Sequence, residues 1–378
     1  MRIRALLSAV AIASLVASTA PAETPPREGF RLAKPGWIFE FPRDHGTHDE
    51  FRTEWWYFTG HLRSGAGRRY GFEVTFFRVG AGEAPAVSGA GATNWDLRNV
   101  ALAHFALTDA EAREFRYYEK LNRSTPFLAD AKPGLLHVFN EGWSVTTAGD
   151  GAWRLVARDG GDTIDLTLRA EKAPAIHGRD GISVKAAGEG HASHYYSMTR
   201  LAAEGTVATK DRSEKVRGQA WMDHEFGSAM LREHQAGWDW FSLQFDNDTE
   251  LMLYVIRKRD GAPDATSSGS IVLADGQVIH LERADFSVEA RGRWKSPASG
   301  ATYPMGWRIR VPKFGIELDL REVLKAQELV TKKSTQVTYW EGAVDVTGRS
   351  GGTLVRGEGY VEMTGYDRPF SDPAAGSR

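Results

Sequence analysis

The sequence predicts an all-β protein made of two related antiparallel β-barrels. Alternating runs of apolar and polar residues, which are typical of β-strands, recur along the chain, whereas helical periodicity is scarce. Gly, Asp and Asn separate these runs at roughly regular spacing, as in antiparallel barrels and sandwiches. Similar segments occur in both halves of the chain. Short helices are expected only at 107–120 and 321–331.

Each half opens with an aromatic hairpin and closes with a V-R-G strand. The openings begin at Trp56-Tyr57-Phe58 and Trp240-Phe241-Ser242, and the closing strands are 216–223 and 355–362. A period this long indicates domain duplication rather than a solenoid, although chance similarity between aromatic strands is the alternative. We expect a first domain over 23–227 and a second over 228–370. Residues 371–378 are expected to form a disordered tail.

The N-terminus has the pattern of a cleavable signal peptide. Arg2 and Arg4 precede a short apolar run, 5–17, and Ala20-Pro21-Ala22 has the small-residue pattern of a cleavage site. We expect cleavage after Ala22 and a periplasmic or secreted mature protein. No later stretch is apolar for long enough to cross a membrane.

The composition of the chain limits which cofactors and binding partners the protein could have. The chain has no cysteine, so an exported protein would be held by its cores without disulfides. A formal charge of −2 gives no electrostatic argument for nucleic acid. No glycine-rich loop before a helix indicates a nucleotide, and Ser197 lies in no G-x-S-x-G elbow. We therefore predict no cofactor and no nucleic-acid partner.

The block from Thr53 to Leu62 places a carboxylate among large aromatic rings. On a strand, Glu54 and Trp56 share one face while Trp55 and Tyr57 occupy the other. A carboxylate beside apolar rings costs free energy unless it is paired or solvated. The pattern predicts either a cavity mouth or a structural hydrogen-bond network at Glu54.

The strongest polar cluster surrounds Asp223 and His224. Alternation places Trp221, Asp223 and Glu225 on one face of a strand and His224 on the other, so the acid and the imidazole reach one cavity only if a bulge re-aims one of them. An acid and an imidazole near a domain junction are suited to general acid/base work. The alternative is structural pairing, for example with Arg217.

Aromatic residues supply a candidate ligand wall. Trp238 and Trp240 share a face, which favours a flat apolar ligand, although a barrel-closing role is an equal alternative. Trp340 precedes Glu341 and repeats the pairing of an aromatic with an acid. The full set of candidate ligand-binding residues is Trp56, Tyr196, Trp221, Trp238, Trp240, Tyr254 and Trp340.

A metal site is not predicted. His45 and His48 lie among acidic residues, a composition that could bind a divalent ion. No companion ligand set stands at a diagnostic spacing. A metal-dependent hydrolase using His45, His48 and His224 is retained as the last alternative.

Five segments together resemble one known group: 45–50, 54–62, 195–201, 221–225 and 238–241. They resemble the AttH-like/carotenoid 1,2-hydratase (CrtC) family, whose exported members are called predicted secreted hydrolases. The resemblance covers nearly the whole mature chain. It implies two lipocalin-like domains with a pocket at or near their contact, and long, apolar, unsaturated substrates.

The resemblance also implies roles for single residues. Asp223 and His224 become the candidates for acid/base catalysis, with Glu54 as a further candidate carboxylate at the rim. Trp238, Trp240 and Tyr254 would face a carbocation. One position departs from the hydratases, where an acid is expected two residues after the tyrosine; here it is Ile256.

Three functions therefore stay open at this point. The first is an exported protein that binds a hydrophobic, isoprenoid or polyene molecule and acts on it as a hydratase, lyase or hydrolase. The second is a non-catalytic carrier, or an accessory protein of an export system. The third is the metal-dependent hydrolase. The sequence does not give the oligomeric state.

Overall fold

Residues 29–81, 98–228 and 231–370 are described by a computed structural model of the chain. They form twenty-three β-strands and three short 3₁₀ turns, η1 (Arg43–His45), η2 (Arg283–Asp285) and η3 (Pro312–Phe314). The all-β prediction is confirmed. The predicted signal peptide, 1–22, and the predicted tail, 371–378, lie outside the described residues. Among the described residues, no helix has the length and apolarity needed to span a membrane.

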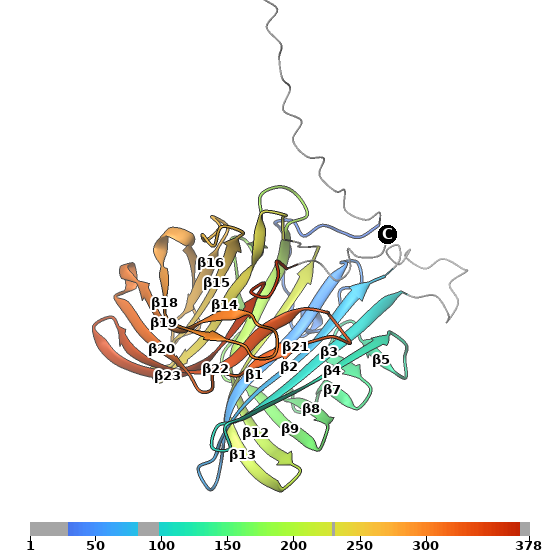
Figure 1. The fold of residues 1–378 in the computed structure, drawn as a ribbon. Coiled ribbons are helices and arrows are strands. Elements are labelled where there is room, and N and C mark those ends of the chain that lie inside the picture. Colours follow the sequence, from blue (N-terminus) through green and yellow to red (C-terminus); the bar gives the residue numbers. More distant parts are fainter. Residues whose placement is uncertain (1–28, 82–97, 229–230, 371–378) are drawn as a thin grey trace, which may run out of the picture.

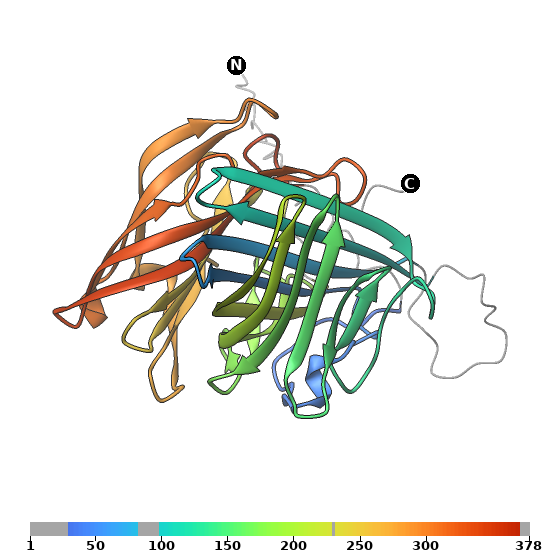
Figure 2. The same cartoon turned by 90° about the horizontal axis from the view of Figure 1, so that it is seen from below.

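The strands form two antiparallel sheets. The first follows the order β4 (Glu114–Arg123), β3 (Asn99–Asp109), β2 (Arg69–Gly80), β1 (Thr53–Ser64), β13 (Arg212–Gly227), β12 (Ala192–Thr209), β9 (Asp162–Ala170), β8 (Trp153–Asp159), β7 (Trp143–Thr147), β6 (His137–Asn140) and β5 (Ala129–Ala131). β10 (Ala175–Ile176) and β11 (Ile182–Val184) also pair with β12. This sheet curls into a nearly closed barrel (Figures 1 and 2).

The second sheet is a half-barrel. Its order is β17 (Val278–Glu282), β16 (Ser268–Val272), β15 (Glu250–Lys258), β14 (Gln235–Phe245), β23 (Thr353–Thr364), β22 (Thr338–Ser350), β20 (Ile316–Glu322), β19 (Thr302–Val311) and β18 (Ser287–Lys295), with β21 (Glu328–Val330) also pairing with β22. In both sheets the first strand lies between the second and the last, β1 between β2 and β13 and β14 between β15 and β23. This shared connectivity agrees with the predicted duplication.

Both expected helices are wrong. The segment 107–120 falls on the hairpin of β3 and β4, and 321–331 covers the end of β20 and β21. Leu107 and Phe105 of β3 are fully buried in the first core. Pairing of β3 with β2 therefore overrides any local helical preference.

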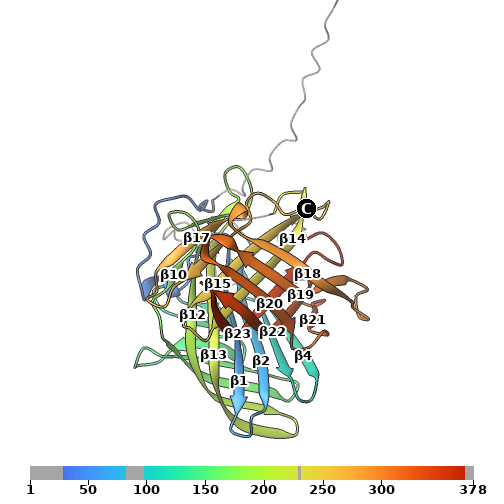
Figure 3. The same cartoon turned by 90° about the vertical axis from the view of Figure 1, so that its left-hand side faces the viewer.

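Alternation along the strands separates each core from the contact between the sheets. On β1, Trp56 and Phe58 point into the core of the first barrel, whereas Tyr57 packs in a separate cluster between the sheets. On β13, Met222 lies in the core of the first barrel, whereas Trp221 lies in the cluster between the sheets. In that cluster the ring of Trp240 on β14 contacts the rings of Tyr57 and Trp221. The two sheets therefore contact each other through their outer faces (Figure 3).

Buried polar contacts fix this arrangement. The Nε2 of Gln244 on β14 donates to the carbonyl oxygens of Thr199 and Ala220 at 2.7 and 3.0 Å. The fully buried carboxylate of Glu250 accepts from Arg200 at 2.6 Å and from Lys172 at 2.9 Å. Because buried polar groups are costly when unpaired, these contacts oppose separation of the sheets.

Candidate functional site

A cavity of about 210 Å³ lies between the two sheets. Most of its wall is aromatic or aliphatic, and both sheets contribute. Tyr57 and Tyr195 are buried deep in the wall, whereas Trp55, Trp238 and Phe370 are half-buried and lie toward its outer part. Apolar cavities with a few convergent polar groups are the usual form of a small-molecule site.

Asp223 is the best-defined polar group of this cavity. Its carboxyl accepts from Trp221 Nε1 at 2.5 Å, from the Tyr195 hydroxyl at 2.6 Å, and from the Ser197 hydroxyl. Burial raises the pKa of Asp223 to about 7, and the three donors only partly oppose this. The Asp223 carboxyl is therefore poised between acid and base at neutral pH.

Two glutamates from the second sheet join Asp223. Glu341 on β22 and Glu362 on β23 are directly paired, and both line the cavity. The Tyr57 hydroxyl donates to Glu341 Oε1 at 2.7 Å, and Trp238 Nε1 donates to Glu362 Oε2 at 3.1 Å. Burial, followed by Glu362 and Glu73, holds the pKa of Glu341 well above its usual range, and burial raises the pKa of Glu362 to about 7.

The Glu341 carboxyl has one free position. Among the described residues, its buried Oε2 has no hydrogen-bond partner. A buried, unpaired oxygen normally indicates a missing ligand or water. Cations are scarce around the cavity: Lys185 lies 2.8 Å from Glu225 and 4.1 Å from the centre of the Tyr254 ring. The cavity can thus supply protonated carboxyl groups beside aromatic faces.

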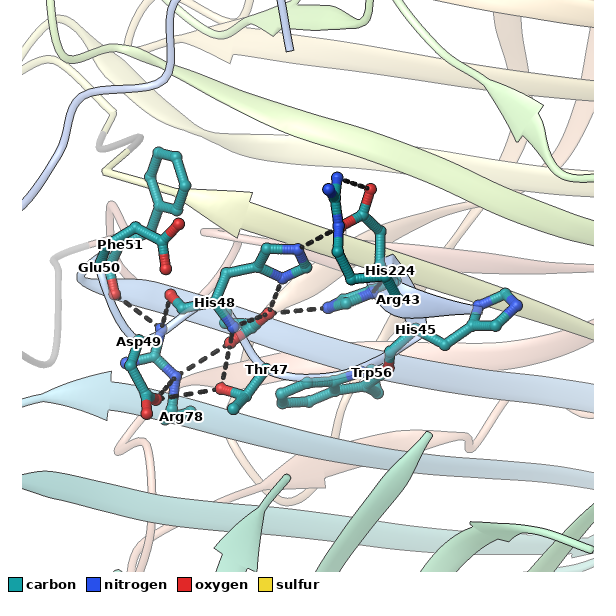
Figure 4. A network of polar contacts seen from close by, with 12 residues as sticks. Arg43, His45, Thr47, His48, Asp49, Glu50, Phe51, Trp56, Arg78 and His224 are labelled. Atoms are coloured by element: carbon teal, nitrogen blue, oxygen red, sulfur yellow. Dashed lines mark hydrogen bonds and ion pairs between the residues drawn. The ribbon is translucent and has the colours of Figure 1, made fainter. Parts of the chain in front are cut away.

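Glu54 belongs to a different environment on the inner face of the first barrel. Its carboxylate contacts His48 Nδ1 at 2.8 Å, His224 Nε2 at 2.9 Å and Arg78 Nε at 3.0 Å. Figure 4 shows His48, His224 and Arg78 converging on this network. Asp44 contacts the other nitrogen of His48 at 3.1 Å. The prediction of a structural hydrogen-bond network at Glu54 agrees with this geometry.

The pKa of Glu54 in this network shifts in the opposite direction to the pKa values of the cavity carboxyls. Although burial alone would raise the pKa of Glu54, Arg78 and the two histidines hold it well below its usual range. Hydrogen bonds and charges of Asp44 and Glu54 raise the pKa of His48 to about 9 despite burial. Burial lowers the pKa of His224. The network therefore pairs an ionised Glu54 with the cations Arg78 and His48, and His224, which contacts the same carboxylate, is neutral.

Three residues of this network, His48, Glu54 and His224, are also the candidate metal-binding group among the described residues. The ligand atoms of His48, Glu54 and His224 lie within 4.8 Å of one another. They fit a divalent ion poorly, because Arg78 already neutralises Glu54 and His48 is cationic at neutral pH. His45, the other expected ligand, instead lies 2.7 Å from the Tyr196 hydroxyl. These contacts favour a structural role for the group over metal binding.

The structure separates the three candidate catalytic residues. Asp223 presents its side chain to the cavity, as does Glu225 two positions later. His224 points into the first barrel, where its Nδ1 contacts the Asp44 carbonyl at 3.0 Å and the Tyr196 hydroxyl at 3.1 Å. Glu54 borders the cavity, but its carboxylate is occupied by the network. Asp223 and His224 therefore face different environments, as the alternation predicted.

The candidate ligand-binding residues also divide. Three of them, Trp238, Trp240 and Tyr254, line the cavity. Trp221 donates a hydrogen bond to the Asp223 carboxyl. The other three lie in the barrel cores, which corrects their expected role; they are Trp56, Tyr196 and Trp340. An aromatic residue in a strand is apolar on either face, so only its place in the alternation distinguishes core from cavity.

Several cavity residues were not singled out from the sequence as ligand-binding or catalytic. They are Tyr57, His104, Lys185, Tyr195, Glu362 and Tyr339. Glu362 could have been found, because the V-R-G repeat aligns it with Asp223. Ile256, where an acid was expected, is fully buried and does not line the cavity. His104 and Tyr339 carried no local signal.

The family follows from comparison with known proteins. The AttH-like family model matches residues 32–366. The chain belongs to the AttH-like family. A crystal structure of an AttH protein from Nitrosomonas europaea is 30% identical, with a TM-score of 0.78, covering 89% of this chain and 99% of that one. The predicted family and the pair of lipocalin-like barrels are thereby confirmed.

More distant structures share the fold. Kievitone hydratase from Nectria haematococca is 16% identical with a TM-score of 0.67, over 91% of this chain and 98% of that one. CghA in complex with Sch210972 is 16% identical with a TM-score of 0.53, over 91% and 98% of the two chains. No curated protein sequence matches the chain.

Proposed function

We propose that this AttH-like protein binds a compact, unsaturated hydrophobic molecule in the cavity between its sheets and adds water to it or removes water from it. The observation that carries the proposal is Asp223, a carboxyl with a pKa of about 7 in an aromatic-walled cavity. The shared fold with a kievitone hydratase supports the same reaction class.

The proposed hydration has two steps. The Asp223 carboxyl gives its proton to one carbon of the alkene, which leaves a carbocation on the other carbon and a carboxylate on Asp223. The faces of Trp240, Trp238 and Tyr254 stabilise that cation. Water then forms the new C–O bond and releases one proton toward solvent, and the Asp223 carboxylate regains one proton from solvent, so the sum is alkene plus water giving an alcohol. Dehydration is the reverse sequence.

Two features match the needs of these steps. Tyr195, Ser197 and Trp221 hold the Asp223 carboxylate that remains after protonation, because all three donate to it. The unpaired Oε2 of Glu341 offers a place for the attacking water. A cavity of about 210 Å³ lies below the range of drug-sized ligand pockets. We therefore propose a compact alkene, or the end of a longer one, in place of a fully enclosed polyene.

A direct test supplies terpenoid and prenylated phenolic alkenes, together with their tertiary alcohols, in water labelled with heavy oxygen. The expected result is gain or loss of one water, with the label in the alcohol, followed by mass spectrometry. Asp223→Asn should lower turnover by about 100-fold or more, the usual scale of general acid catalysis. Asp239→Asn is the matched control, because Asp239 lies beside Arg257 and Tyr366 and does not line the cavity.

The same experiment separates the alternatives. Retention of an alkene without turnover would identify a carrier, and cleavage of esters of the same alcohols, added to the panel, would identify a hydrolase. Full activity in Asp223→Asn would reject the assigned acid.

Export is part of the proposal. The residues that support it, Arg2, Arg4 and Ala20-Pro21-Ala22, belong to the sequence alone. N-terminal sequencing of the protein recovered from the native host should begin at Glu23. A mature protein that retains Arg2 would contradict export by this signal.

A further inference from the structure

A second polar chain, separate from Asp223 and Glu341, begins at the cavity wall. Tyr339 and His104 both line the cavity, from different sheets. The Tyr339 hydroxyl lies 2.7 Å from His104 Nδ1. His104 Nε2 lies 2.9 Å from the Ser334 hydroxyl, and that hydroxyl donates to Glu119 Oε2 at 2.7 Å.

The chain connects a buried region with the surface. His104 is 1% exposed, and Tyr339 and Ser334 are 6% and 8% exposed. Glu119 lies half-buried on β4, near the edge of the first sheet. Its Oε2 also accepts from the backbone amides of Lys333 and Ser334 at 3.0 and 2.9 Å. An oxygen that accepts from three donors carries no proton of its own, so Glu119 Oε2 acts purely as an acceptor.

Because Glu119 only accepts, every proton in the chain can be placed. The single proton of the Ser334 hydroxyl goes to Glu119, so the Ser334 oxygen accepts from His104 Nε2–H. Burial lowers the pKa of His104 to about 3, so the ring is neutral and Nδ1 carries no proton. Tyr339 must then donate its hydroxyl proton to Nδ1. Its oxygen keeps its lone pairs for a group in the cavity.

We infer that Tyr339, His104, Ser334 and Glu119 form a proton relay between the cavity and solvent, in which Tyr339 takes the proton of a cavity-bound water or hydroxyl. This inference rests on the proposed function. Tyr339 stands two positions before Glu341 on the same face of β22, and both residues line the cavity that would hold the water. Tyr339 is the residue that touches the reacting water, and the other three are positioning residues.

The transfer balances atom by atom. Water attacks the cation through oxygen and gives one proton to the Tyr339 oxygen, which passes its own proton to His104 Nδ1. His104 releases its Nε2 proton to the Ser334 oxygen, and Ser334 releases its proton to the Glu119 carboxylate. Glu119 then exchanges with solvent. The Glu119 carboxylate can accept this proton, because the oxygen of a water bound to a carbocation is strongly acidic.

The test measures exchange of the Tyr339 hydroxyl proton with water by NMR in the full chain. Tyr57 is the internal control, because its hydroxyl donates to Glu341 in the same cavity without a histidine. In the wild type we expect an exchange cross-peak between water and Tyr339. Ser334→Ala should abolish that cross-peak and leave Tyr57 unchanged.

A second variant separates a relay from a purely structural chain. Glu119→Gln still accepts from Ser334 but cannot take up its proton. We expect His104 to keep its proton on Nε2, seen in the nitrogen shifts of the ring, while the Tyr339 cross-peak is lost. Glu114→Gln, on the same strand but paired with Arg116, is the matched control and should behave as the wild type.

The outcomes separate this inference from the proposed function. Unchanged Tyr339 exchange in both Ser334→Ala and Glu119→Gln would overturn the relay, whatever the enzyme does. A proton on His104 Nδ1 in the wild type would also overturn it. If the relay is observed and no alkene in the panel is hydrated, the proposed function fails while the relay stands.

Discussion

Glu54 and Asp223 are buried carboxyls on neighbouring strands, β1 and β13; they lie on opposite faces of the first sheet, and their pKa values shift in opposite directions. Inside the first barrel, Glu54 is surrounded by Arg78, His48 and His224, and its pKa falls well below the usual range. Between the sheets, Asp223 accepts only neutral donors, and its pKa rises to about 7. Burial is common to both, so the partners decide whether a carboxyl is a permanent charge or a proton donor.

The difference also separates structure from chemistry. The charged network ties the segment around His48 to β1, β2 and β13 and has no free capacity for a ligand. The cavity between the sheets has protonatable carboxyls and an unpaired oxygen on Glu341. Removing a group from each region should therefore affect different properties.

The largest expected effect is on stability. Glu54→Gln removes the buried carboxylate that Arg78 and His48 share and leaves them Asp49 and Asp44 as acidic partners, which should lower the free energy of unfolding by about 3–5 kcal/mol. Asp223→Asn, the matched cavity variant, should cost about 1 kcal/mol, because an amide replaces a carboxyl that is largely neutral. Urea denaturation at neutral pH measures both. Equal losses would erase the distinction between the two regions.

The cavity acids and the barrel acid should affect folding stability in different directions as the pH changes. Since the folded pKa of Asp223 and Glu362 is raised, their contribution is full below about pH 4 and is lost as pH rises toward about 7. Since the folded pKa of Glu54 is lowered, its contribution is present above about pH 4.3 and is lost in more acid solution. Each cavity acid contributes up to about 1.4 kcal/mol per pH unit.

Between about pH 4.5 and 6.5 the cavity acids lose their contribution, whereas that of His48, with a pKa of about 9, falls only above about pH 6.5. Buried neutral histidines such as His104, with a pKa of about 3, add stability over the same range, so Asp223 is isolated by comparing the wild type with Asp223→Asn. Asp223→Asn should make the slope of stability against pH more positive by up to about 1.4 kcal/mol per pH unit. An unchanged slope would place the raised pKa elsewhere.

Matched tryptophan variants should separate core from cavity. Trp56 is fully buried, stacks on His224 and donates to the His45 carbonyl at 3.0 Å, so Trp56→Phe should cost about 1–3 kcal/mol of stability. Trp240→Phe should instead weaken binding of an apolar fluorescent naphthalene probe by roughly fivefold, about 1 kcal/mol. Probe titration and denaturation of both variants provide the check; reversed effects would exchange their assignments.

The smallest expected effect is a shift in the pKa of Asp223. Ser197 donates to Asp223 and also lies 2.7 Å from His177 Nε2. Ser197→Ala removes a donor that favours the carboxylate, so the pKa of Asp223 should rise further. A carboxyl titration followed by NMR measures this shift. A fall in that pKa would show that Ser197 does not act as a donor to Asp223.

Local alternation predicted much of this arrangement. It placed Asp223 and His224 on opposite faces, and the V-R-G repeat aligned Asp223 with Glu362 in the second sheet. It could not show which outer faces meet, because that depends on contacts far apart in sequence. His104 and Tyr339, for example, are separated by 235 residues. The core position of Trp340 was missed because an aromatic next to an acid looks the same at a cavity rim.

The central claim is that the cavity acid Asp223 keeps its proton up to about neutral pH, whereas the barrel acid Glu54 is ionised there. Infrared difference spectroscopy of the carboxyl C=O stretch tests it directly in the wild type, Asp223→Asn and Glu54→Gln. We predict a protonated-carboxyl band that titrates near pH 7; Asp223→Asn should remove its Asp223 component and leave that of Glu362, and Glu54→Gln should retain both. Titration of the Asp223 band near its unperturbed value, about pH 4, would contradict the account.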